Sequence, residues 1–210
     1  MKRKSIITVF LLSICIVASW GCGGGPGTPG SQNTDDLGVI ISASLVPTYF
    51  SVDTYSVDVV QQICQPGPPP TIEKFADHGA NLTVLTRLMN PNPPVPPGNL
   101  YIEKYTIEYF RDSDSIGAPP IESDTRFETL IVPVPLSGTD TASLTATVVL
   151  VDLKRKIRYL TDMSSGQFTS GPALINNYTA VYTFEGKSQY GKSFSFKVQT
   201  KFQIGSFNYC

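Results

Sequence analysis

Residues 186–193, from Gly186 to Ser193, fit the phosphate-binding pattern G-x-x-x-x-G-K-[ST]. In that chemistry, backbone N–H groups and a helix N-terminus face the phosphates, so a buried strand must precede the loop and a helix must follow it. Here the residues on both sides alternate between apolar and polar types, which is typical of half-buried strands. The segment therefore predicts a β-hairpin loop and no nucleotide site.

Four carboxylates lie close together in sequence and would supply the oxygen ligands that calcium prefers: Asp112, Asp114, Glu122 and Asp124. The pattern departs from an EF-hand because Ile116 stands where an oxygen ligand belongs. We therefore favour a solvated acidic turn, and a calcium site remains the alternative hypothesis.

His78 is the only histidine of the chain. A serine hydrolase would need a nucleophile within a G-x-S-x-G motif, which the sequence lacks, and a zinc site would need further His or paired Cys ligands. We predict that His78 lies in a solvated loop, that the chain is not an enzyme, and that it carries no metal or cofactor. With 16 basic and 17 acidic residues, the composition also argues against nucleic-acid binding.

Three tyrosines recur at one phase of a predicted strand, namely Tyr101, Tyr105 and Tyr109. An aromatic strip of this kind is a possible ligand surface on which sugars could stack. The same alternation is equally explained if these side chains form the inward face of a sheet, and we favour that interpretation.

Basic residues gather in the segment that contains Lys154, Arg155, Lys156 and Arg158. They would suit contact with anionic lipid, although we favour a solvated connector. The surrounding residues 152–160 predict one or two helical turns, with a continued strand as the alternative.

Period-two alternation and turn residues predict the fold class. Residues 194–204 show it most clearly, and residues 178–185 would pair with them as a hairpin.

The proline-rich segments 66–70 and 91–97 cannot lie in central strands, since proline lacks an N–H donor. We predict that they form rigid loops, and a ligand for a proline-binding module is the alternative. We expect an all-β, two-sheet immunoglobulin-like sandwich of about 7–9 antiparallel strands, with strands at residues 39–45, 55–63, 81–88, 101–111, 127–134, 143–151, 178–185 and 194–204.

The N-terminus has the layout of a secretory signal peptide. Three cations precede residues 6–20, which contain no charge and are fewer than the roughly 18–20 residues that a membrane-spanning helix needs. Gly21-Cys22 followed by Gly23 resembles the lipobox of bacterial lipoproteins. The resemblance implies a signal helix at residues 1–21, an acylated Cys22 that attaches the chain to a membrane, and sorting to the outer membrane of a Gram-negative bacterium. Simple cleavage after Gly21 without a lipid is the alternative.

Residues 22–36 are rich in Gly, Pro and polar residues and predict a flexible tether, which makes residues 37–210 the folded domain. After cleavage, Cys22, Cys64 and Cys210 remain. Acylation of Cys22 would leave an even pair in an oxidising compartment, which predicts a Cys64–Cys210 disulfide. Pairing of Cys210 with another chain is the alternative.

Residues 81–92, which end in Asn90-Pro91-Asn92, resemble the strand-and-turn signature of the WHy/LEA-2 β-sandwich family. That family offers no catalytic residues to carry over. Together, these features predict a cell-envelope lipoprotein whose sandwich presents a binding or structural surface to an envelope protein or a glycan. The alternatives are an accessory scaffold subunit of a secretion or assembly complex, or an enzyme.

Overall fold

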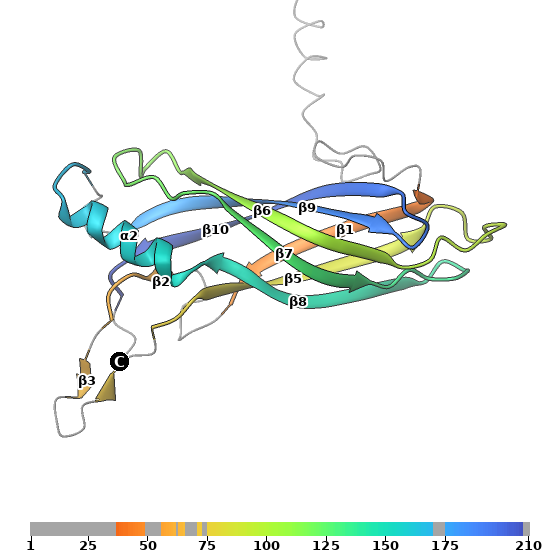
Figure 1. Cartoon of the computed structure of the whole chain (residues 1–210), viewed down its shortest axis with the longest axis horizontal. Coiled ribbons are helices and arrows are strands. Elements are labelled where there is room, and N and C mark those ends of the chain that lie inside the picture. The colour runs from red at the N-terminus through yellow and green to blue at the C-terminus, as the bar shows by residue number, and fades with distance from the viewer. Residues whose placement is uncertain are drawn as a thin grey trace, which may run out of the picture.

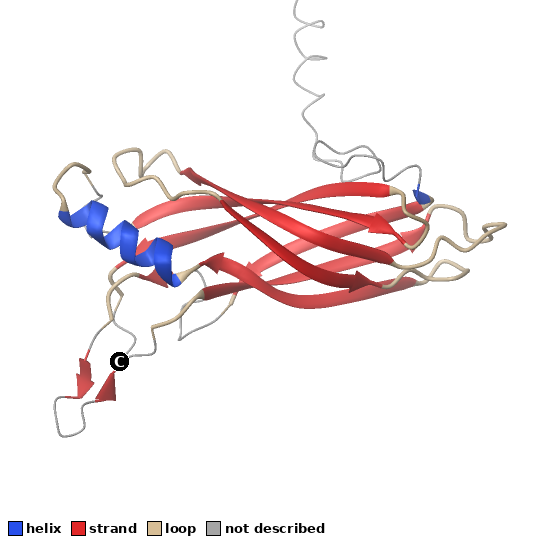
Figure 2. Cartoon of the chain, viewed as in Figure 1, coloured by secondary structure: helices blue, strands red, loops and turns tan. Residues whose placement is uncertain are grey.

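The computed structural model describes residues 37–48, 56–61, 63–65, 71–72, 75–169 and 175–207. The predicted signal peptide and tether lie outside these residues. The described chain forms two main β-sheets that pack face to face, a separate two-stranded ribbon, and one helix at an end of the molecule (Figure 1; Figure 2). The all-β fold class is confirmed. The immunoglobulin-like subclass stays a prediction, because the smaller sheet is strongly curled.

The larger sheet contains five strands in the order β2 (Ser56–Asp58), β10 (Ser193–Gly205), β9 (Asn176–Ser188), β6 (Leu100–Arg111) and β7 (Asp124–Val132). The smaller sheet has the order β1 (Val39–Pro47), β5 (His78–Leu88) and β8 (Thr141–Val151). A separate ribbon pairs β3 (Ile63–Gln65) with β4 (Thr71–Ile72). Neighbouring strands run antiparallel except for β2, which is parallel to β10.

The prediction of one strand over residues 55–63 was wrong. The segment divides into the short strand β2, which joins the larger sheet, and β3, which belongs to the ribbon. The apolar run gave no sign of this division, because the parallel pairing of β2 with β10 joins residues that are far apart in sequence.

The predicted hairpin of β9 and β10 is confirmed and supplies much of the core. The two strands pair in antiparallel register, with Phe184 opposite Phe196. Tyr182 and Phe184 are fully buried, and the Phe184 and Phe196 ring centroids lie 5.1 Å apart. Because such stacked rings remove large apolar areas from water, this hairpin anchors the sandwich.

Helix α2 (Leu153–Ser164) follows β8 directly and is longer than the one or two turns predicted. Asp152 caps it, since its Oδ1 accepts a hydrogen bond from the backbone N–H of Arg155 at 2.9 Å. Tyr159 is buried against the sandwich, and its hydroxyl accepts a hydrogen bond from Asn176 Nδ2 at 2.8 Å. Within the part of the chain that the structure describes, no helix combines the length and the apolar character that crossing a membrane requires.

Candidate functional site

His78 is the first residue of β5 and is only 1% exposed, so the prediction of a solvated loop was wrong. Burial, assisted by the nearby positive charge of Lys156, lowers its pKa to about 4. At neutral pH the imidazole is therefore uncharged. The sequence pattern could not show this burial because helix α2, which supplies Lys156, lies far from His78 along the chain.

The basic segment does not form a solvated patch. Lys156 is 3% exposed, its Nζ donates to the carbonyl of Ala76 at 2.8 Å, and it lies 5.1 Å from the centre of the Phe75 ring. Arg155 is also largely covered, which leaves Lys154 and Arg158 facing solvent. Two of the four cations in the anionic-lipid hypothesis are therefore not accessible to lipid.

The four carboxylates predicted as an alternative calcium site do not converge. Each is engaged by a different group, and no cluster of three or more metal-ligating side chains occurs among the described residues. Their arrangement therefore gives no support to a calcium site. Their partners are Thr179 and Lys201 for Asp112, Ser115 and Asn177 for Asp114, Arg158 for Glu122, and Arg126 and Arg155 for Asp124.

A four-charge network, which sequence reasoning missed, joins β7 to the start of α2. Arg126 contacts Asp124 at 2.6 Å and Asp152 at 2.7 Å. Arg155 contacts the same two carboxylates at 3.2 Å and 2.8 Å. Three of the four side chains are between 12% and 14% exposed, so the network is largely shielded from water. It fixes the helix against the edge of the larger sheet.

The three candidate tyrosines do not form one surface. A β-bulge between Ile102 and Lys104 shifts the alternation of β6, which places Tyr105 and Tyr109 on the inward face and Tyr101 on the outward face. Tyr105 is 1% exposed, and its hydroxyl accepts from the Val149 N–H at 3.2 Å. The favoured inward interpretation thus holds for Tyr105 and Tyr109 but not for Tyr101.

The inward tyrosines serve to join the two sheets. The Tyr109 hydroxyl donates to the Leu150 carbonyl at 2.5 Å, and the Tyr182 hydroxyl donates to the Val149 carbonyl at 2.7 Å. Together with Tyr105, they bind consecutive peptide groups of β8 from the opposite sheet. Burial raises the pKa values of all three, so these hydroxyls stay protonated at neutral pH.

Two segments that looked unrelated in the sequence meet at the end of the sandwich opposite α2 (Figure 1). The proline-rich segment 91–97 lies against the turn between β9 and β10, where the Tyr190 hydroxyl donates to the Pro96 carbonyl at 3.1 Å. The turn closes through a 2.8 Å bond from Ser188 N–H to the Lys192 carbonyl, with Gly191 at φ 80°. The phosphate-loop pattern is thus a hairpin turn, as predicted, because β10 follows it immediately.

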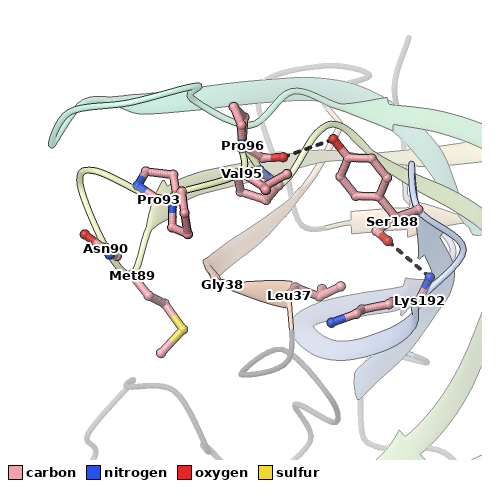
Figure 3. A pocket seen from close by; sticks show the side chains of 12 residues that line it. Leu37, Gly38, Met89, Asn90, Pro93, Val95, Pro96, Ser188 and Lys192 are labelled. Carbon is pink, nitrogen blue, oxygen red and sulfur yellow. Dashed lines mark hydrogen bonds between the residues drawn. The ribbon is translucent and has the colours of Figure 1, made fainter.

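The loop-end pocket is a hollow of about 270 Å³ that opens to solvent (Figure 3). It is lined by these two segments together with residues 37–38, which precede β1, and residues 89–90, which follow β5. Apolar side chains supply most of its wall, and Lys192 is the only charged residue among those that line it. Such a hollow suits an apolar partner that tolerates or prefers a nearby positive charge. Its principal side chains are Leu37, Met89, Pro93, Val95, Tyr190 and Lys192.

Leu37, the first described residue, is part of this pocket. The polypeptide chain therefore enters the domain at the loop end. The predicted lipidation residue Cys22 lies outside the described residues, as does Cys210. Cys64 lies on β3 and is half-buried. The disulfide between Cys64 and Cys210 therefore stays a prediction.

A scan against protein-family models and searches of curated proteins and of solved structures found no match to this chain. The lipobox and WHy/LEA-2 resemblances therefore rest on their sequence patterns.

Proposed function

We propose that this chain is an exported lipoprotein of the cell envelope, attached through acylated Cys22, whose β-sandwich is a binding module and not an enzyme. The observation that carries the proposal is the order of residues 1–25, in which a cationic start and a short uncharged apolar run lead to Gly21-Cys22-Gly23. The acyl chains would hold the domain at a bilayer, and Gly23 after the lipidated cysteine favours the outer membrane.

The engagement of the ionisable side chains supports binding over catalysis. His78 is buried and uncharged, and Asp112, Asp114, Glu122 and Asp124 each have cationic or hydrogen-bonding partners within the fold. By contrast, the loop-end pocket presents apolar side chains to solvent. This distribution suits recognition by shape and apolar contact better than it suits acid–base chemistry.

Mass spectrometry of the protein isolated from envelope fractions tests the anchor. We expect a chain that begins at Cys22 and carries acyl groups on its sulfur and amino nitrogen. Cys22→Ala should accumulate as the unprocessed precursor, whereas the matched variant Cys64→Ala should be processed normally. Recovery of an unmodified Cys22 at the mature N-terminus would refute the lipoprotein assignment.

A second step in the same assay concerns sorting. Gly23→Asp should move the processed protein from the outer to the inner membrane fraction, while Gly24→Asp should leave it in place. Equal distribution of the two variants would remove the support for the outer membrane.

A scaffold role within an envelope assembly complex is the second candidate, and the edge strand β7 favours it. Among the described strands, β7 pairs only with β6. It exposes Phe127 by 82% and Ile131 by 53% on the outer face. An edge strand with exposed apolar side chains can accept a strand from another protein. A photo-crosslinking residue at Phe127 should then capture one discrete envelope protein, and one at Leu85 on the smaller sheet should not.

The glycan-binding alternative loses its proposed surface. Tyr105 is inaccessible, and Tyr101 faces away from Tyr109. A glycan array on which Tyr101→Ala abolished binding would restore it.

A further inference from the structure

We propose that the loop end of the sandwich docks onto the surface of the bilayer that holds the anchor, with its apolar side chains in the interfacial layer. The inference rests on the proposed acylation of Cys22. It adds an orientation, since acylation of Cys22 alone does not specify which face of the domain meets the membrane.

Three neighbouring loops expose large apolar side chains at this end. Their exposed fractions are 44% for Met89, 64% for Val95, 69% for Leu136 and 60% for Tyr190. The loops hold one another in place: Gly138 N–H donates to the Pro91 carbonyl at 2.7 Å, and Gln189 N–H donates to the Asn99 carbonyl at 2.9 Å. The four side chains therefore project from one shared rim and not from separate flexible tips.

The chemistry of this rim matches a bilayer interface. Tyrosine prefers the headgroup region because its ring is apolar and its hydroxyl is polar. Aliphatic side chains gain by leaving water for the acyl boundary. The prolines of segment 91–97 stiffen the loop, so little chain entropy is lost on docking. Lys192, exposed beside Tyr190, places a positive charge where lipid phosphates lie.

The chain enters the domain at the same end, which selects the membrane over other apolar partners. Residues 23–36 would span roughly 20 Å as a flexible chain. The sandwich is longer than that, because the 13 residues of β9 extend over roughly 40 Å. The tether thus keeps the loop end close to the surface, and a local concentration in the millimolar range makes a weak apolar contact sufficient.

A single-tryptophan reporter tests the orientation. Trp20 is the only tryptophan and lies in the predicted signal peptide, so the processed protein would contain none. Tyr190→Trp would place one at the loop end, and Ile157→Trp, at a site 53% exposed on α2, would be the matched control. Each processed lipoprotein is reconstituted into phosphatidylethanolamine–phosphatidylglycerol vesicles with and without brominated acyl chains.

We expect bromolipid to reduce the fluorescence of Tyr190→Trp about twofold, with a blue-shifted emission, and to leave Ile157→Trp unchanged. Leu136→Trp, in a different loop, should behave like Tyr190→Trp. This second reporter would show that the quenching does not result from the substitution at Tyr190 alone. Equal quenching of the loop-end and α2 reporters, or none in either, would overturn the docking inference.

The mass of the N-terminal peptide from the same samples separates this inference from the proposed function. An acylated Cys22 with an unquenched loop-end reporter would leave the lipoprotein assignment intact and refute the orientation alone. An unmodified Cys22 would refute both.

Discussion

The two ends of the sandwich use their side chains in opposite ways. At the helix end, meaning α2 with residues 75–78 and 122–126, the charged and polar groups contact one another or the backbone, as the Arg126–Asp124–Arg155–Asp152 network does. At the loop end, meaning residues 37–38, 89–99, 133–140 and 189–192, large apolar side chains face solvent around a pocket. At the helix end, charged side chains hold the fold together. At the loop end, exposed apolar side chains remain available for contact with another molecule.

This contrast implies that stability and binding are separable. Substitutions at the helix end should cost folding free energy, because they leave buried groups without partners. Substitutions at the loop end should leave folding free energy nearly unchanged and alter only contacts with other molecules. Unfolding in urea measures the stability part of this separation.

The largest effect is expected for the predicted Cys64–Cys210 disulfide. Phe207, the last described residue, donates its N–H to Asp58 Oδ1 at 2.9 Å, so it lies beside the end of β2, six positions before Cys64 in the sequence. Cys64→Ala should lower the free energy of unfolding by about 2–5 kcal/mol, because the cross-link restricts the unfolded chain. Thiol labelling should detect two cysteines only after reduction. Labelling of Cys64 without reduction would contradict the pairing.

The next largest effect is a loss of stability in acid. The pKa of His78 is about 4 in the fold and about 6.5 in an unfolded chain, so the unfolded state binds a proton first as the pH falls. Stability should decrease by about 3 kcal/mol between pH 6.5 and pH 4, and this contribution should be absent above pH 7. In His78→Asn, the urea concentration at the midpoint of unfolding should change less with pH over that interval than it does in the wild type. Parallel curves for the two proteins would contradict a buried neutral His78.

A third prediction compares one cation from each end. Arg155→Ala should cost about 2–4 kcal/mol, since Asp124 and Asp152 would then share only Arg126 in a largely covered site. Lys192→Ala, at the exposed turn, should change stability by no more than about 0.5 kcal/mol. Equal costs at the two ends would remove the distinction on which the comparison depends.

The sequence predicted the parts of this fold that local alternation governs. The core of strands β5–β10 and the β9–β10 hairpin followed from period-two patterns, because each strand buries one face. His78 was misplaced because the groups that cover it, helix α2 and the segment before β5, come from distant parts of the chain. The pairing of Arg126 with Asp152 was likewise not predictable, since nothing local links β7 to a helix cap 26 residues later.

The loop-end pocket shows the same limit. Both of its motifs were visible in the sequence, one as a proline-rich loop and one as a hairpin turn, but their contact depends on the arrangement of the strands. The bulge near Lys104 had only a weak signal in the pattern, the adjacent charged residues Glu103 and Lys104, which interrupt the alternation of β6.

The smallest expected effect is a difference in stability between substitutions on the two faces of β6. This difference tests whether the bulge is present. Tyr109→Phe removes the hydrogen bond to the Leu150 carbonyl and leaves that carbonyl under-satisfied between the sheets, so stability should fall by about 1 kcal/mol. Tyr101→Phe, on the outward face, should change stability by less than about 0.5 kcal/mol. If the bulge were absent and the alternation unbroken, Tyr101 would share the inward face, and the two substitutions would cost similar amounts. A difference between them therefore reports the shift in register itself.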